Sequence, residues 1–87
     1  MTAKSYTVKS PEGLHARPAT TLAKIANQYE NSINIIYDDK TINLKSVIGL
    51  MSLGIPSNGT FYIQIDGDNQ ETIFNVFEKT LKENEII

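Results

Sequence analysis

The sequence predicts an α+β fold, an open-faced β-sandwich in which a four-stranded antiparallel sheet carries three helices on one face. Short segments with alternating apolar residues indicate strands with one buried side, and segments with apolar residues three and four positions apart indicate helices. The two kinds follow one another in the order β-α-β-β-α-β-α, and this split β-α-β connectivity favours antiparallel pairing. With 87 residues and no linker-like stretch, we expect one domain over 1–87 with one modest core.

The first strand and the first helix are separated by a loop that ends at the chain's single histidine. Tyr6 and Val8 alternate with polar residues as in a half-buried strand, and Pro11 and Gly13 then break it. The helix that follows runs for about three turns. Its predicted buried stripe is Ala19, Leu22, Ala23 and Ala26, flanked by Ile25 and Tyr29. Pro18 is tolerated only in a first helical turn, so the helix begins near His15 or Ala16.

Two strands and a short helix make up the middle of the chain. Asp38-Asp39 is a plausible two-residue turn between strands over 32–37 and 40–44. The predicted inward residues of these strands are Ile33, Ile35, Tyr37, Ile42 and Leu44. Ser46 is a natural N-cap for a helix of about two turns, and Gly54 followed by Pro56 is a stop signal.

A last strand and a last helix complete the pattern. Phe61, Ile63 and Ile65 alternate over 60–65 as the inward side of the fourth strand. Asp68 or Asn69 can cap the final helix, and Glu71 suits its first turn. The predicted apolar stripe of this helix is Ile73, Val76, Phe77 and Leu81.

Composition excludes several classes of function. The net charge of −2 makes a broad nucleic-acid-binding face unexpected. The absence of cysteine excludes disulfides, thiolate metal sites and cysteine nucleophiles, and a single histidine makes a metal site poor. Neither a signal-like apolar run nor a span of ~20 apolar residues is present, so we expect a cytoplasmic protein.

His15 is the first candidate for a reactive residue, because it lies at or beside a helix N-terminus. The unpaired N–H groups there bind phosphate readily, and their partial positive charge disfavours a second positive charge on the ring. A ring nitrogen is thereby left available as a nucleophile, while the N–H groups of Ala16 and Arg17 and the Arg17 guanidinium can hold phosphoryl oxygens. From the residues alone, an inert capping histidine with Arg17 in solvent explains the pattern equally well. A Ser-His-Asp triad is disfavoured, and a small phosphatase would need a general base that is not evident.

Ser46 and the apolar segment after it each allow two interpretations. Ser46 is an N-cap, and it is also a candidate phosphorylation site where the helix dipole would stabilise a phosphate and Lys45 would partly neutralise it. Six apolar residues follow it, more than a two-turn helix can bury on one stripe. Either some of them remain exposed as a docking patch beside the His15 loop, or all six are core. These six are Val47, Ile48, Leu50, Met51, Leu53 and Ile55.

Two motifs together resemble a known family. The segment "GLHARPAT" is similar to the phosphohistidine signature of the HPr family, the phosphocarriers of the phosphoenolpyruvate-dependent sugar phosphotransferase system. The segment "NLKSVIGLMSLGI" is similar to the regulatory-serine segment of the Gram-positive members. The resemblance covers essentially the whole chain in length and element order.

The resemblance implies a relay protein that is acted on by enzymes and is not one itself, with no cofactor and no metal. His15 would accept a phosphoryl group on Nδ1 from phosphorylated enzyme I and pass it to the IIA domains of sugar permeases, assisted by Arg17. Ser46 would be phosphorylated by an ATP-dependent HPr kinase/phosphorylase, and that form would serve a catabolite-control transcription factor in carbon catabolite repression. The residues at partner-contacting positions are Thr20, Lys24, Lys45, Val47, Ile48 and Met51. We expect a monomer with no direct contact with nucleic acid or membrane.

Two departures and one alternative accompany the resemblance. Glu12 stands where small polar residues are more usual, and its carboxylate would oppose the helix field at His15. The chain ends in Ile86-Ile87, so a terminal carboxylate is assigned no role near Arg17. The alternative function is a purely regulatory HPr-like binding module that acts through Ser46, although His15 argues against it because such paralogues lack the active histidine.

Overall fold

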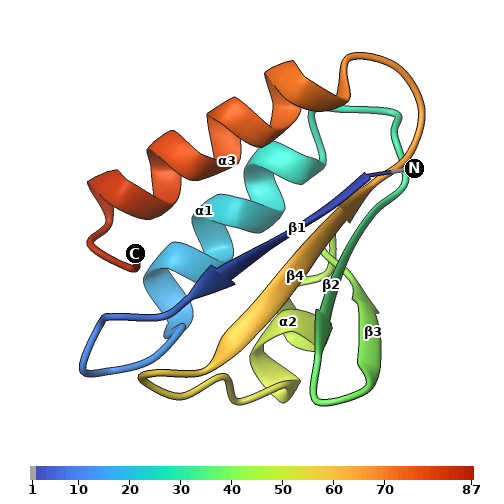
Figure 1. Cartoon of the computed structure of the whole chain (residues 1–87). Coiled ribbons are helices and arrows are strands. Elements are labelled where there is room, and N and C mark those ends of the chain that lie inside the picture. The colour runs from blue at the N-terminus through green and yellow to red at the C-terminus, as the bar shows by residue number, and fades with distance from the viewer. Residues whose placement is uncertain (1) are drawn as a thin grey trace.

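The structure, a computed structural model that describes residues 2–87, confirms the predicted fold class and element order. The elements are β1 (Thr2–Thr7), α1 (Ala16–Ala26), β2 (Ile33–Tyr37), β3 (Lys40–Asn43), α2 (Val47–Ser52), β4 (Thr60–Ile65) and α3 (Gln70–Glu83). The strands form a four-stranded sheet in the order β1-β4-β2-β3, with every neighbouring pair antiparallel. The three helices lie on one side of this sheet, and the other side stays open (Figure 1).

The strand predictions hold because each strand alternates between a covered and an open face. Phe61, Ile63 and Ile65 of β4 are fully buried toward the helices, and Tyr62 between them is exposed on the open face. The turn at Asp38-Asp39 has φ of 50° and 64°, the left-handed conformation that a type I′ hairpin turn requires. Tyr37 and Ile42, predicted inward, are only half-buried: Ile42 lies on β3, the edge of the sheet, and Tyr37 lies beyond the β2 residues that pair with β4.

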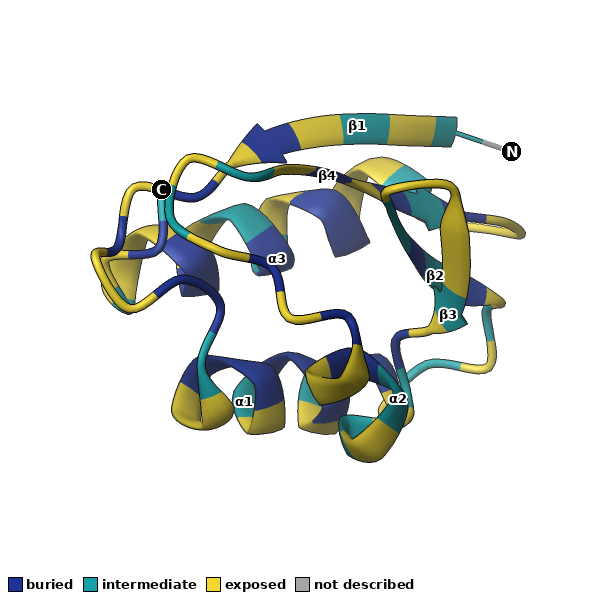
Figure 2. Cartoon of the chain, turned by 90° about the horizontal axis from the view of Figure 1, so that it is seen from below, coloured by how far each residue is buried: buried dark blue, intermediate teal, exposed yellow. Residues whose placement is uncertain are grey.

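The helices turn their apolar stripes toward the sheet (Figure 2). In α1 the predicted stripe is confirmed, since the buried residues are Pro18, Ala19, Leu22, Ala23 and Ala26. In α3 the predicted stripe was wrong at one position, because Phe74 is fully buried and Val76 is only half-buried. Phe74 and Val76 lie on either side of the line formed by Ile73, Phe77 and Leu81. Phe74 lies on the buried side, where Lys4 of β1 lies over its ring.

The start of α3 is held differently from the prediction. Asn69 occupies the N-cap position, but its backbone is left-handed (φ 60°) and its side chain makes no capping bond. The loop is fixed from outside, by Asn31, whose Nδ2 donates to the carbonyl oxygens of Asp66 and Asp68 at 2.7 and 2.8 Å. A contact between segments 35 residues apart thus fixes the loop that leads into α3.

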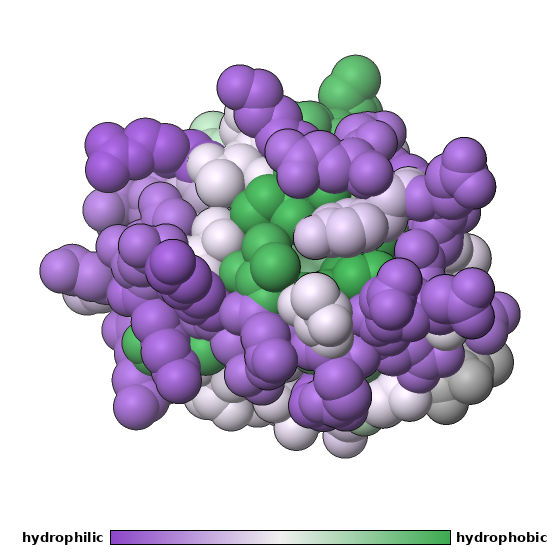
Figure 3. All heavy atoms as spheres, turned by 90° about the horizontal axis from the view of Figure 1, so that it is seen from above, coloured by the Kyte–Doolittle hydropathy of each residue, from purple (hydrophilic) through white to green (hydrophobic). Residues whose placement is uncertain are grey.

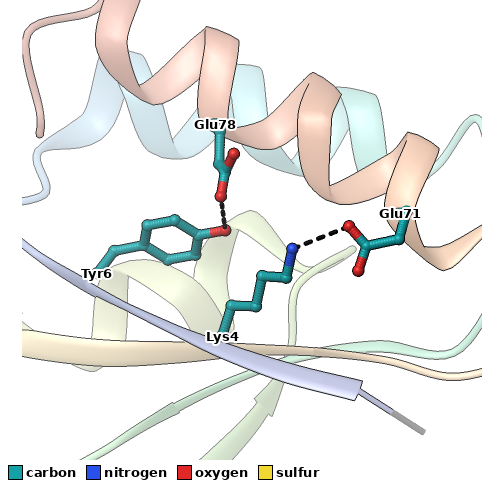
Figure 4. Close-up of polar contacts among 4 residues, drawn as sticks. All are labelled: Lys4, Tyr6, Glu71 and Glu78. Carbon is teal, nitrogen blue, oxygen red and sulfur yellow. Dashed lines mark hydrogen bonds and ion pairs between the residues drawn. The ribbon is translucent and has the colours of Figure 1, made fainter.

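Polar contacts join the edge strand β1 to α3 (Figure 4). Lys4 Nζ lies 3.0 Å from Glu71 Oε2 and 4.9 Å from the centre of the Phe74 ring. The Tyr6 hydroxyl donates to Glu78 Oε1 at 3.1 Å. Burial, and then the bond to the Glu78 carboxylate, raise the pKa of Tyr6 well above its ordinary value.

The face of the molecule that carries α3 is mainly hydrophilic (Figure 3). On the face that carries α3, hydrophilic side chains surround a central group of hydrophobic ones (Figure 3). Within residues 2–87, none of the helices is both long and apolar enough to span a bilayer. Over the same residues, no three His, Cys, Asp or Glu side chains are grouped as metal ligands.

Candidate functional site

His15 lies where the loop after β1 becomes α1. It occupies the predicted N-cap position with an extended backbone (φ −88°, ψ −179°), and its side chain makes no capping bond. The imidazole is half-buried, with Nδ1 3.2 Å from the carbonyl oxygen of Gly13. Because a carbonyl oxygen only accepts, this hydrogen bond requires the proton on Nδ1 and leaves the ring lone pair on Nε2.

The first turn of α1 provides free donors next to the imidazole. Pro18 has no N–H, and the N–H of Ala19 already donates to the His15 carbonyl oxygen at 3.1 Å. Over the described part of the chain, the N–H groups of Ala16 and Arg17 have no acceptor, and the exposed Arg17 guanidinium forms no ion pair. An anion at this helix start would therefore meet main-chain donors and an unengaged cation.

Gly13 fits the loop closely against the segment that follows α2. Its φ of +70° is left-handed, and a Cβ at this position would overlap the carbonyl oxygen of Ile55 and lie 3.0 Å from Pro56 Cα. The next residue, Leu14, is buried and donates its N–H to the same Ile55 oxygen at 2.9 Å. The loop before His15 is thus packed backbone to backbone on residues 55–56, and no local sequence pattern indicated this contact.

Glu12 lies in the same loop but does not pair with His15. Its carboxylate makes no ion pair within the described residues, and its N–H approaches Ser10 Oγ at 3.4 Å. The side chain is exposed. The sequence predicted that the Glu12 carboxylate would oppose the effect of the helix field on His15. No direct contact between the Glu12 carboxylate and His15 supports this prediction.

Thr20 and Lys24 lie one turn apart on α1, and both are exposed. The Thr20 hydroxyl donates to the Ala16 carbonyl oxygen at 2.8 Å, so it is directed back to the first turn of the helix. Lys24 lies in the last turn, where a cation is favourable for the helix dipole. Both positions are open to a partner protein.

Ser46 is the N-cap of α2, as predicted. Its Oγ accepts the N–H of Gly49 at 3.0 Å, and the residue is exposed. Gly49 has little room for a side chain, because a Cβ there would lie 2.8 Å from Ile42 Cγ2 and 3.2 Å from Ser46 Oγ. The turn after Ser46 is therefore tightly packed beneath an accessible hydroxyl.

Lys45 has a structural contact that the sequence did not indicate. Its half-buried side chain donates from Nζ to the Tyr29 carbonyl oxygen at 2.8 Å. In the other direction, Asn27 Nδ2 donates to the Lys45 carbonyl oxygen at 2.9 Å. The residue before Ser46 is thereby fastened to the end of α1, and a role for it in partner binding stays a prediction.

These contacts fix the relative direction of α1 and α2. Residues at the start of α2 contact the end of α1 through Lys45 and Asn27, and the segment after α2 contacts the loop that precedes α1 through Ile55 and Leu14. The two helices therefore run antiparallel. Since the 11 residues of α1 span about 16 Å, Ser46 and His15 lie at opposite ends of the helix pair.

The apolar residues of 47–55 divide between core and surface. Leu50, Leu53 and Ile55 are buried, whereas Ile48 is 86% and Met51 38% exposed. Val47 is half-buried. We call Val47, Ile48 and Met51 the α2 patch. It belongs to the helix that links the Ser46 end to the His15 end. The expectation that some of the six apolar residues stay exposed is confirmed, and the alternative that all six are core is wrong. A role of the patch in docking stays a prediction.

The residues next to His15 on α1 are accessible, since Ala16, Arg17 and Thr20 are all exposed. A pocket of about 240 Å³ lies elsewhere, lined by Glu30, Asn31, Gly67 and Asp68. These residues lie in the loop after α1 and the loop before α3, at the other end of α1 from His15.

Comparison with known proteins identifies the family. Residues 2–83 match the family model PTS-HPr, described as the PTS HPr component phosphorylation site. The chain belongs to the HPr family. The HPr fold is also found in the solved histidine-containing phosphocarrier protein of Mycoplasma, with a TM-score of 0.94 and 32% identity over 99% of this chain and 98% of that one.

Two further solved structures bear on the function. HPr from Bacillus anthracis gives a TM-score of 0.81 and 33% identity, covering 91% of this chain and 94% of that chain. Crh, a catabolite repression protein of Bacillus subtilis that forms a domain-swapped dimer, gives 0.71 and 26% over 100% and 99%. The HPr family thus includes phosphocarriers and a catabolite-repression protein of the same fold.

Proposed function

We propose that this chain, acting as the single domain 1–87, is a phosphocarrier that accepts a phosphoryl group on His15. The supporting observation is the placement of the imidazole at the start of α1, beside the free N–H groups of Ala16 and Arg17 and the unpaired Arg17 guanidinium. Phosphoryl transfer depends on such positioning and charge stabilisation, since charge spreads over the equatorial oxygens in the transition state. The exposure of Ala16, Arg17 and Thr20 leaves this helix start accessible to another protein that delivers the group.

The transfer moves a phosphoryl group from enzyme I to the His15 imidazole. A lone pair of a His15 ring nitrogen attacks phosphorus, the bond between phosphorus and the donor atom of phosphorylated enzyme I breaks, and a new N–P bond forms on His15. The proton that His15 loses passes through solvent to the departing donor group, so the His15 ring ends neutral. For acceptance on Nδ1, the ring has to give up its hydrogen bond to the Gly13 carbonyl oxygen, and the proton has to move to Nε2. A second transfer delivers the group to IIA domains of sugar permeases: an acceptor group there attacks phosphorus, the N–P bond of His15 breaks, and the proton that the acceptor loses passes through solvent to the His15 ring.

Incubation with phosphoenolpyruvate and enzyme I tests this role. We expect one acid-labile, alkali-stable phosphate per chain, located on His15 by mass spectrometry and absent from His15→Ala. Ser46→Ala is the matched control and should keep the label. Retention of the label by His15→Ala would exclude the relay role.

We also propose that Ser46 is a regulatory phosphorylation site for an ATP-dependent HPr kinase/phosphorylase. The exposed hydroxyl at the N-cap of α2 supports the proposal, because a phosphate at a helix start need not unfold the domain. The added negative charge would lie at the edge of the α2 patch. The modified form would serve a catabolite-control transcription factor. Kinase treatment should give an acid-stable phosphate on Ser46, and phosphate found only on another residue would reject the assignment.

The second candidate function is a regulatory module that acts through Ser46 alone. The likeness to Crh at 26% identity favours it, and it predicts that enzyme I leaves the chain unlabelled. The label test on His15 therefore separates the two functions. We propose a monomer as the working state, and light scattering on the purified chain checks it against a swapped dimer of the kind described for Crh.

A further inference from the structure

The end of α3 turns back toward the loop that carries His15. The helix ends at Glu83, and Glu85 adopts the left-handed conformation (φ 58°). Glu85 N–H then donates to the Lys82 carbonyl oxygen at 3.0 Å, and Ile86 N–H donates to that of Leu81 at 2.8 Å. This pair of bonds is a Schellman motif, which reverses the chain after a helix and usually contains glycine where Glu85 stands.

The reversal delivers Ile86 to the far side of the same loop. Its side chain is fully buried in the core, and its carbonyl oxygen accepts the N–H of Lys9 at 2.6 Å. Lys9 comes two residues after β1 ends, so this bond holds the chain just beyond its last contacts with the sheet. Those contacts are the paired bonds of Val8 with Asn58 and Gly59.

The loop from Lys9 to Leu14 is thereby fixed at its two ends. Ile86 holds the Lys9 end, and Ile55 holds the Leu14 end. Between them the main chain has only local bonds, such as the one from Gly13 N–H to the Ser10 carbonyl oxygen at 3.0 Å. The Gly13 carbonyl oxygen that contacts His15 Nδ1 belongs to this segment.

We propose that Ile86 is a positioning residue for phosphoryl transfer, which holds the Lys9 end of the loop through its main-chain oxygen and so sets the orientation of the His15 imidazole. The effect of Ile86 on the orientation of the ring is independent of the proposed function. Only the expected effect on the rate of phosphoryl acceptance rests on that function. Ile86 touches neither the imidazole nor a phosphoryl group, and it acts through the loop.

The experiment separates positioning from ordinary core stability. Ile86→Ala and Ile73→Ala each remove the same atoms from a fully buried isoleucine, one next to the loop and one in the first turns of α3. We expect both to lower the unfolding temperature. Only Ile86→Ala should shift the ¹⁵N and ¹H resonances of the His15 ring and lower the turnover of phosphoryl acceptance at saturating enzyme I, by roughly tenfold to a hundredfold. Ile86→Val should restore both. Equal effects of the two alanine variants on the His15 ring would overturn the proposal.

A second pair of variants tests the hydrogen bond itself and covers the case in which Ile86→Ala does not fold. Lys9→Pro removes the N–H that Ile86 accepts, and Lys9→Ala keeps it. We expect shifted His15 resonances in Lys9→Pro and wild-type resonances in Lys9→Ala, and identical His15 spectra in the two would overturn the proposal. The spectra need no phosphoryl donor, so they test the positioning of the ring independently of enzyme I. If enzyme I fails to label the wild-type chain, that result rejects the proposed function and leaves the positioning proposal to be decided by the spectra.

Discussion

The Nδ1 atom of His15 lies 3.2 Å from the carbonyl oxygen of Gly13, so the ring points this nitrogen at its own loop. We expect the neutral imidazole of the resting protein to carry its proton on Nδ1. Two-bond ¹H–¹⁵N spectra of the ring measure this directly, and a predominant Nε2–H tautomer would contradict it. After phosphorylation on Nδ1, the same spectra should show loss of that proton, and the neutral ring should then carry its lone pair on Nε2.

Gly13→Ala tests how tightly the loop is packed. Alanine at φ +70° costs about 1–2 kcal/mol for the left-handed backbone, and its Cβ would also overlap the Ile55 carbonyl oxygen. Gly54→Ala is the matched control, because Gly54 has φ +58° and an added Cβ there would meet nothing within 4 Å. We expect Gly54→Ala to lose only the backbone cost in denaturant unfolding and Gly13→Ala to lose clearly more. Equal losses would show that the close approach to Ile55 is not important for stability.

Local pattern was enough to predict the elements and the two caps. Three local patterns were sufficient: the alternation in β4, Pro18 in a first helical turn, and Ser46 before an apolar run. Each pattern depends only on neighbouring residues, so it can be predicted from the sequence alone. The sequence did not determine which residue beside the apolar stripe of α3 is buried. Phe74 and Val76 both flank the stripe, and the choice between them depends on the position of β1.

The contacts that arrange the site were beyond sequence patterns because they join distant backbone groups. Any residue has a carbonyl oxygen, so nothing marks Tyr29 as the partner of Lys45 or Ile86 as the partner of Lys9. The antiparallel run of α1 and α2 follows from such contacts. For that reason the sequence allowed an exposed patch beside His15 as one of two alternatives, but did not indicate that Ser46 lies at the other end of the helix pair.

Ser46→Ala and Ser46→Asp separate the capping role from the effect of charge. Alanine removes the acceptor of the Gly49 N–H, and we expect a loss of about 1 kcal/mol in the free energy of unfolding. Aspartate keeps an acceptor at the N-cap, so its stability should stay close to wild type.

The same aspartate variant should weaken docking. Because Ser46 lies about one helix length from His15, we expect Ser46→Asp to raise the KM of enzyme I for this protein more than it lowers kcat. Thr41→Asp, on the exposed edge strand β3, adds the same charge away from the α2 patch and should leave both constants near wild type. A lowered kcat with unchanged KM would indicate that the charge acts on the chemical step.

Glu85→Gly should stabilise the protein. Glu85 holds a left-handed conformation (φ 58°) at the position of the Schellman motif where glycine carries no steric penalty. We expect a gain of about 1 kcal/mol in denaturant unfolding. Glu85→Ala removes the carboxylate but keeps the strain, so it should remain near wild type, and an equal gain in both variants would assign the effect to charge.

Tyr6 should make stability depend on alkaline pH. Its pKa in the folded protein is raised above the ordinary value of about 10, by burial and by the bond to Glu78. The stabilising contribution is therefore complete below pH 10 and is lost as the pH rises above it, because the unfolded chain releases the phenolic proton first. Thermal unfolding between pH 8 and 11 should show a steeper fall for wild type than for Tyr6→Phe. Tyr62→Phe, which changes an exposed side chain on the open face and leaves Tyr6 intact, should keep the wild-type slope. A slope that is unchanged in Tyr6→Phe would assign the alkaline loss to other groups.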